Sequence, residues 1–492
     1  MKNILLALLL FINFAAIGQT EAEKAASTIF KSDIEAQIHF LASDELKGRD
    51  TGTDEIKIAA SYLANSLRKF NVTPAGDDGS YYQNVPLEKV LAPSHTSLQI
   101  NDIVGDKFLH MSAKNISFKG EAIYLDYGSP EDFKSHDVKG KLVVVKAGTA
   151  ETENPRSKLS AGRAKRKLAD SLGAAALIEL IDLEDKLYDR YSHYFNASKT
   201  GLKSDEEAAE KFAHLWMVDK GLENAAALAA SKSLKADLNI EGVTIENFSC
   251  RNVVGYMEGS DPKLKDEFII YSAHYDHLGI GKPNAENDSI YNGARDNAVG
   301  TVTVLSVAEN FNKYPTKRSA LFLFFTGEEK GLLGSTYYSE HPSLPLDQMV
   351  YCFNSDNGGY NDTSKITIFG LNRTTATHHI VAAAKEFDLT AIDDPAPEQG
   401  LFDRSDNVNF AKKGIPAPTY TMGFTSFDEE IMKYYHQASD NPENMDYDYL
   451  VKFFKSYVLS SRLIANDPKT PFWTEGDKYY DAGVKLYEKK LE

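Results

Sequence analysis

FIIYSAHYDH, the sequence of residues 268–277, joins an apolar run of strand length to a cluster of histidine and aspartate side chains. The run shows no alternation with charged residues, which is typical of a strand whose two faces are both buried. His274 stands directly after it. Because open α/β sheets bind ligands beyond the carboxyl ends of their strands, this stretch predicts a binding site at that edge of a sheet.

Two further apolar runs end in acidic residues. Residues 320–325 precede Glu328 and Glu329, and residues 349–353 precede Asp356. Strands that run in the same direction deliver the residues after them to one edge of a sheet. We therefore expect these carboxylates to lie beside one another and beside the first histidine.

The alternation of strand-like and helical patterns begins after Arg251 and continues toward the carboxyl end of the chain. Such alternation predicts an α/β fold with a mixed, mostly parallel sheet and helices on both faces, a three-layer αβα sandwich.

Two more polar side chains complete the predicted site. Asp296 lies in the glycine-containing loop 292–297 before a predicted helix, and His436 follows late in the chain. Imidazole and carboxylate ligands suit zinc, and a carboxylate between two metal ions can bridge them. The predicted ligands of two divalent metal ions are His274, Asp296, Glu329, Asp356 and His436.

Two residues beside these ligands have predicted supporting roles. Glu328, next to the ligand Glu329, is placed to accept a proton from water as a general base. Asp276 lies two residues after His274, so on an extended backbone it points the same way and can hold the imidazole.

The length of 492 residues exceeds what one hydrophobic core usually covers, so we expect more than one domain. The pattern of apolar and polar residues also changes along the chain. Helical patterns near the start give way to short strand-like pieces and then to Ala-rich blocks at 160–180 and 204–233, which we expect to be helical. The predicted organisation is a signal peptide at 1–18, a discontinuous α/β domain with the predicted ligands at 25–91 and 246–470, an inserted β-rich domain at 92–245, and a C-terminal extension at 471–492.

The net charge and the N-terminal sequence limit the partners and the cellular location that we expect. The formal net charge of -17 argues against nucleic acid as a partner. Lys2 precedes an uncharged run that is too short for a comfortable membrane span and ends in small residues, as in a secretory signal peptide. We therefore expect a secreted or periplasmic protein without stable membrane insertion after signal removal. Cys250 and Cys352 lie in apolar strand-like stretches, which predicts buried thiols rather than a required disulfide.

The motifs together resemble those of the co-catalytic dizinc aminopeptidases, the family of bacterial leucyl aminopeptidases, aminopeptidase Y and the glutamate carboxypeptidases. The matching stretches are SAHYDH at 272–277, GARDNAVG at 293–300, TGEEKGLLGS at 326–335, NSD at 354–356 and YHQ at 435–437, with LASDELKGR at 41–49 and RSDN at 404–407. Residues 138–145, within the predicted insertion, are similar to a protease-associated domain.

The resemblance implies specific roles. His274 and Asp356 would hold one zinc ion, Glu329 and His436 the other, and Asp296 would bridge them. Tyr435 matches a tyrosine that polarises the scissile carbonyl in some members. The family also implies a cis peptide bond directly after the bridging aspartate. Asn407 departs from the family, where many members have histidine, which puts local substrate contacts in doubt.

Several functions remain open at this stage. An aminopeptidase acting on peptide substrates is the leading hypothesis, and a carboxypeptidase or dipeptidase on the same scaffold is the alternative. A free amine needs a carboxylate partner, whereas a substrate carboxylate needs a cation, for which Arg295 and Arg404 are candidates. A non-enzymatic binding protein is disfavoured by the complete ligand set and the retained base. A glutaminyl-cyclase-like transferase is disfavoured by the protease-associated insertion and the intact His274 position.

Overall fold

The computed structural model describes residues 18–151, 155–203 and 212–491. The chain forms two compact units, the first from Met1–Val85 with Cys250–Glu492 and the second from Pro86–Ser249. The predicted insertion at 92–245 lies inside the second unit. The predicted signal peptide lies outside the described residues except for Gly18.

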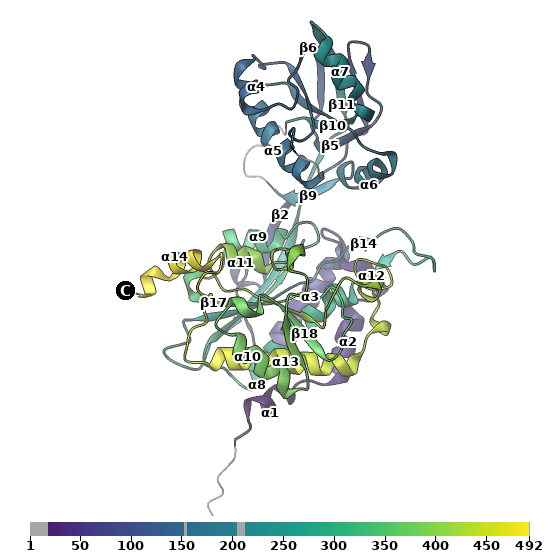
Figure 1. The fold of residues 1–492 in the computed structure, drawn as a ribbon. Helices are drawn as coiled ribbons and strands as arrows, with labels where there is room; N and C mark the ends of the chain where they lie inside the picture. Colours follow the sequence, from purple (N-terminus) through teal and green to yellow (C-terminus); the bar gives the residue numbers. More distant parts are fainter. Residues whose placement is uncertain (1–17, 152–154, 204–211, 492) are drawn as a thin grey trace, which may run out of the picture. The chain divides into compact units, whose positions relative to one another are not determined.

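A mixed sheet forms the centre of the first unit (Figure 1). Its middle strand, β13, is parallel to a neighbour on each side, and antiparallel pairs occur farther out. In spatial order its strands are β19 (Thr390–Asp393), β18 (Lys365–Phe369), β20 (Thr419–Met422), β17 (Met349–Ser355), β13 (Phe268–His274), β16 (Ser319–Phe325), β12 (Ile245–Met257) and β2 (Tyr82–Val90), with β1 (Thr73–Pro74) on β12. The short strand β9 (Lys199–Leu202) belongs to the second unit and pairs with the end of β2, Leu87–Val90, which belongs to that unit too. A separate ribbon pairs β14 (Gly279–Ile280) with β15 (Ile290–Tyr291).

Helices pack on both faces of this sheet. The helices of the first unit are α1 (Glu21–Ala26), α2 (Lys31–Leu41), α3 (Asp54–Lys69), α8 (Gly300–Lys313), α9 (Leu333–Glu340), α10 (Thr377–Glu386), α11 (Asn407–Lys412), α12 (Glu429–Tyr434), α13 (Tyr447–Asn466) and α14 (Tyr480–Leu491). On one face the ring of Tyr271 meets Phe311 of α8, with centroids 5.6 Å apart. On the other face Leu321 and Leu323 pack with Tyr338 of α9 and with α11. The expected three-layer αβα architecture is therefore confirmed.

The C-terminal segment belongs to this core. Trp473 is buried and its indole nitrogen donates to the carbonyl oxygen of Gly414 at 2.8 Å. The hydroxyl of Tyr487, on α14, donates to the carbonyl oxygen of Met349 at 2.5 Å. Trp473 and Tyr487, which lie in the predicted C-terminal extension, thus pack against the first unit's core.

Both cysteines are buried free thiols, as predicted. Thr326 donates a hydrogen bond from its hydroxyl to the sulfur of Cys250 at 2.9 Å, and burial raises the pKa of the Cys352 thiol to about 12. Among the described residues, no helix combines the length and apolar character that a membrane crossing would require.

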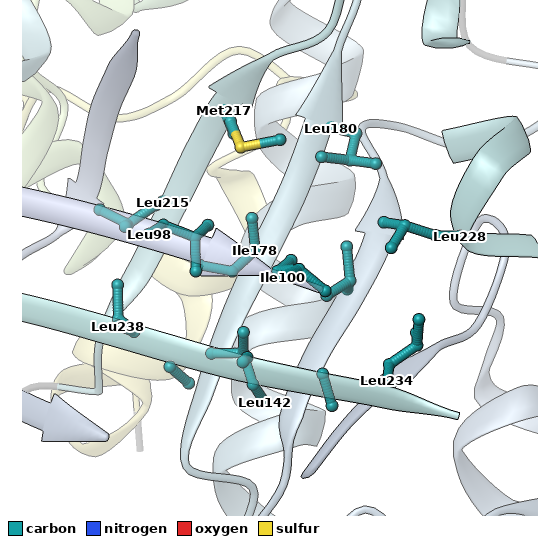
Figure 2. Packing of buried hydrophobic residues seen from close by; sticks show 14 of the residues in the cluster. Leu98, Ile100, Leu142, Ile178, Leu180, Leu215, Met217, Leu228, Leu234 and Leu238 are labelled. Carbon is teal, nitrogen blue, oxygen red and sulfur yellow. The ribbon is translucent and has the colours of Figure 1, made fainter. Parts of the chain in front are cut away.

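The second unit has a sheet of its own. In spatial order its strands are β4 (Ile103–Val104), β3 (His95–Ile100), β11 (Leu234–Glu241), β6 (Ile116–Tyr124), β7 (Leu142–Lys146), β8 (Ala176–Ile181), β10 (His214–Val218) and β5 (Phe108–Ser112). Its helices are α4 (Pro130–Ser135), α5 (Pro155–Ser171), α6 (Asp185–Phe195) and α7 (Glu223–Ala230). Figure 2 shows Ile178 of β8, Leu215 of β10 and Leu238 of β11 in the apolar cluster of this sheet.

Two expectations for this unit were wrong. Residues 160–180 were expected to be one helix, but α5 ends at Ser171 and β8 begins at Ala176. The expected helix at 204–233 contains the strand β10 in its described part. The two strands pair parallel to each other and are buried along their whole length, so pairing and burial override the helical preference of the Ala-rich blocks in which they lie.

Candidate metal centre

The strands of the first unit place the predicted ligands as expected. His274 is the last residue of β13, and Asp356 directly follows β17. Glu328 and Glu329 lie in the turn after β16. Since β13 is parallel to β16 and to β17, these side chains reach the same edge of the sheet.

Asp296 lies between the two predicted histidine ligands. Its Oδ1 is 3.3 Å from Nε2 of His274, and its Oδ2 is 3.2 Å from Nε2 of His436. His274 Nε2 is also 3.3 Å from Oδ1 of Asp356, and His436 Nε2 is 3.4 Å from Oε2 of Glu329. The predicted convergence of the five side chains is confirmed, although they are scattered from residue 274 to residue 436.

The electrostatics of this cluster suit divalent cations. Burial alone would lower the pKa of His436, but the hydrogen bond and charge of Asp296 raise it to about 9. Nε2 of His277 is buried without a hydrogen-bond partner, and Nδ1 of His277 and Oε1 of Glu329 are close to each other but form no aligned hydrogen bond. Unpaired buried donors and acceptors are costly, and a metal ion would satisfy both the carboxylates and the imidazoles. The donor set therefore fits a metal centre.

His277 is a site residue that we assigned no role from the sequence. It is fully buried, and its Nδ1 lies 2.8 Å from Oε1 of Glu329. It forms a compact group of potential ligand atoms with Asp296 and Glu329. The spacing His-x-x-His after a strand was visible in the sequence, but it did not reveal that the second imidazole turns toward the glutamate.

Asp276 differs in part from the prediction. Its carboxylate accepts hydrogen bonds from the backbone amides of Glu328 and Glu329, at 3.1 and 3.3 Å. The ring nitrogen Nδ1 of His274 instead lies 3.2 Å from the backbone oxygen of Asp276 and 3.8 Å from its carboxylate. The reason is that β13 ends at His274, so the two-residue alternation of a strand does not extend to Asp276.

Glu328 faces the cavity described below. Burial raises the pKa of its carboxyl group well above the ordinary value; the imidazole of His274 opposes this rise and the carboxylate of Asp356 adds to it. A carboxylate in such surroundings binds a proton more readily than one in water. This property suits the predicted general base.

The loop that carries Asp296 is closely packed. The peptide bond Asp296–Asn297 is cis, as the family resemblance implied. Asn297 donates from its amide to the carbonyl oxygen of Ser355 at 2.9 Å, which links this loop to the end of β17. A Cβ atom on Gly300 would lie 2.3 Å from the Ser355 carbonyl oxygen, so only glycine fits there.

A cavity of about 300 Å³ opens beside the cluster. Its polar lining includes His274, Asp296, Glu328, Glu329, Asp356, Arg404 and His436, and its apolar lining includes Phe369, Leu401, Phe424, Phe427 and Ile431. Tyr435 also lines it, and the Tyr435 ring stacks on His436 with centroids 4.1 Å apart. Asn407, the position that departs from the family, is buried. Its side-chain amide donates to the carbonyl oxygens of Phe402 and Ala417, so this amide binds the backbone and not the substrate.

Comparisons with known proteins agree with this geometry. Residues 252–459 match peptidase family M28. The chain is 26% identical over 413 residues to aminopeptidase YwaD of Bacillus subtilis, covering 82% of this chain and 78% of the relative. It is 23% identical over 366 residues to a probable leucine aminopeptidase 2 of Aspergillus oryzae, covering 70% and 67%. A solved aminopeptidase from Aneurinibacillus shares the fold, with a TM-score of 0.61 at 19% identity over 91% of this chain and 97% of that one.

Proposed function

We propose, from the premise that residues 252–459 belong to peptidase family M28, that this chain is an exported zinc aminopeptidase that removes N-terminal residues from peptides. The relatives named above as aminopeptidases support the activity. The leader-like residues 1–18 support export.

Two zinc ions are the proposed cofactors. His274 and Asp356 would hold one, Glu329 and His436 the other, and Asp296 would contribute one oxygen to each. The placement of Asp296 between the two histidines supports this division. When bound, the ions supply Lewis acidity that polarises a peptide carbonyl.

The protein's own side chains would carry the proton transfers. Glu328 would accept a proton from the attacking water and then donate it to the leaving amine. Asp276 would hold the backbone of Glu328 and Glu329 in place through the two amide hydrogen bonds. The hydroxyl of Tyr435, beside His436 at the cavity wall, would donate to the carbonyl oxygen of the scissile bond.

The charge of the cavity is the observation that favours an aminopeptidase over a carboxypeptidase. Four carboxylates line it, whereas Arg404 is the single Arg or Lys in its described lining. Arg295, the other candidate anchor for a substrate carboxylate, is turned away: its guanidinium donates to Asp440 and to the carbonyl oxygen of Asn444. Three of the four carboxylates are proposed metal ligands and the fourth is the proposed base, so the cations distinguish the two classes. A substrate carboxylate would find Arg404 alone among the described lining residues.

The apolar wall of the cavity indicates the side chain that the substrate would present. Leu401, Phe424 and Ile431 pack together in one cluster beside the metal-binding residues. A leucine or phenylalanine side chain gains about 1.5–3 kcal/mol on full burial against such a surface. We expect apolar N-terminal residues to be preferred.

Hydrolysis measured together with zinc content tests the proposal. The purified protein should cleave leucine p-nitroanilide faster than N-acylated dipeptides, should lose this activity with a chelator, and should regain it with zinc. Preference for N-acylated dipeptides would indicate a carboxypeptidase. Cyclisation of N-terminal glutamine without hydrolysis would indicate a transferase, and bound peptide without turnover a binding protein.

A further inference from the structure

A second cluster of metal-binding side chains lies away from the catalytic cavity. It consists of His378 and His379 on α10 and Asp467 directly after α13. One potential ligand atom from each residue lies within 4.8 Å of the others. In the described part of the chain, it is the one such group that does not contain a residue of the catalytic cluster.

The contacts within this cluster orient its donor atoms toward a common point. Nε2 of His379 is 2.6 Å from Oδ2 of Asp467, and Nε2 of His378 is 4.0 Å from the same oxygen. The two imidazole rings lie side by side, with centroids 3.9 Å apart. Neighbouring residues of a helix normally point in different directions, so this arrangement requires both rings to turn toward the aspartate.

Backbone groups hold two of the three side chains. Nδ1 of His378 lies 3.2 Å from the carbonyl oxygen of Thr375, an acceptor, so the proton resides on Nδ1 and the lone pair of Nε2 is free. Oδ1 of Asp467 accepts from the backbone amide of Lys469 at 2.9 Å, which leaves Oδ2 to face the histidines.

We propose that His378, His379 and Asp467 form a peripheral site for a first-row transition metal ion such as zinc. Two imidazoles and one carboxylate are a donor set that zinc, nickel and copper bind in proteins. The His378 side chain is 67% exposed, so a fourth position is open to water or to another ligand.

The site lies at the edge of the sheet opposite the catalytic cluster. Asp467 accepts a hydrogen bond on its backbone oxygen from Arg318, the residue before β16, whereas Glu328 and Glu329 follow the other end of that strand. A metal ion here would not participate in hydrolysis. It would join the first turn of α10 to the end of α13, two helices that cover the sheet. The contacting residues, His379 and Asp467, are 88 residues apart in the sequence.

Zinc binding by the full-length chain tests the proposal. Wild type, His378→Ala, Asp467→Asn and a control, His193→Ala, should be equilibrated with zinc and their bound metal counted. His193 is an exposed histidine on α6, so it reports unspecific binding to surface imidazoles. Wild type and the control should hold one zinc ion more per chain than either cluster variant. Cobalt should give wild type a visible absorption contribution that the cluster variants lack.

The readouts separate this site from the catalytic one. The cluster variants should retain the peptidase rate at saturating zinc, which shows that they are folded and that the catalytic ions are in place. Zinc should raise the unfolding temperature of wild type and control more than that of His378→Ala. Equal zinc content and equal cobalt spectra in all four proteins would overturn the proposal. His378→Ala decides the question if Asp467→Asn fails to fold, because that histidine is mostly exposed.

Discussion

Asp440 accepts a hydrogen bond on Oδ2 from the backbone amide of Asp296, at 3.2 Å. The same carboxylate accepts from the amide and the guanidinium of Arg295, and the backbone oxygen of Asp440 accepts from Ala294. Asp440 lies four residues after His436. One buried carboxylate thus joins the loop of the proposed bridging aspartate to the loop of the last proposed ligand.

Replacing Asp440 should disturb the metal centre without touching the substrate. In Asp440→Asn the carboxylate charge that faces Arg295 is lost, and the Asp296 loop is held less firmly. Residues that support metal ligands in this way typically contribute about 10–100-fold in activity or metal affinity. We expect a loss of that order in kcat and faster zinc release to a chelator. Glu443→Gln, an exposed change three residues away, is the control and should leave both unchanged.

Replacing Glu328 should separate metal binding from catalysis. Glu328→Gln removes the proton acceptor while leaving Glu329 and the other ligands, so zinc content should stay at the wild-type value. The rate should fall about 10²–10⁴-fold, the usual contribution of a general base. His274→Ala should instead lower the zinc content. Wild-type turnover in Glu328→Gln would remove this residue from the base role.

Replacing Arg404 distinguishes the two exopeptidase classes. Arg404 is the cavity cation that could hold a substrate carboxylate. For an aminopeptidase, Arg404→Gln should change kcat/KM for leucine p-nitroanilide little. For a carboxypeptidase, the loss of a charged anchor should cost about 2–5 kcal/mol of binding, seen as a large rise in KM for N-acylated dipeptides. Steady-state kinetics on both substrates provide the measurement.

The placement of the candidate metal centre was predictable because its proposed ligands depend on sheet topology. Apolar runs without alternation identify β13, β16 and β17, and parallel strands bring His274, Glu329 and Asp356 to one edge. The sequence order of these elements is enough for that inference. No side-chain direction within a loop is needed.

The supporting residues were not predictable in the same way. The roles of His277 and Asp440 depend on how two loops fold back on the ligands, and neither has a periodic pattern. The strands β8 and β10 were missed for another reason. A short apolar run such as ALIELI (β8) or HLWMV (β10) cannot be told from a buried helix segment by its sequence alone, and pairing within the sheet of the second unit distinguishes the two.

The second unit contains a buried ionic group that should control its stability. Oε1 of Glu179 is 2.5 Å from Nζ of Lys165, and Oε2 accepts from the indole nitrogen of Trp216 at 2.6 Å. His214 Nε2 lies 2.9 Å from the same Oε2. All four side chains are buried. Glu179→Gln would leave the lysine without its carboxylate, and breaking one side of a buried pair costs about 3–5 kcal/mol.

The stability that Glu179 contributes should depend on pH in a defined direction. Burial would raise the pKa of Glu179, but the hydrogen bond from His214 and the charge of Lys165 lower it below the ordinary value. Its stabilisation is therefore present above the unfolded-state pKa of about 4.3 and is lost as the pH falls through the lower folded-state value. In urea titrations the free energy of unfolding of Glu179→Gln should lie well below that of wild type at pH 7. The difference between the two proteins should narrow at pH 3–4. Glu184→Gln, an exposed change before α6, is the control and should match the wild-type free energy of unfolding at both pH values. If Glu179→Gln were destabilised equally at pH 7 and at pH 3–4, an ionic origin of its stability loss would be contradicted.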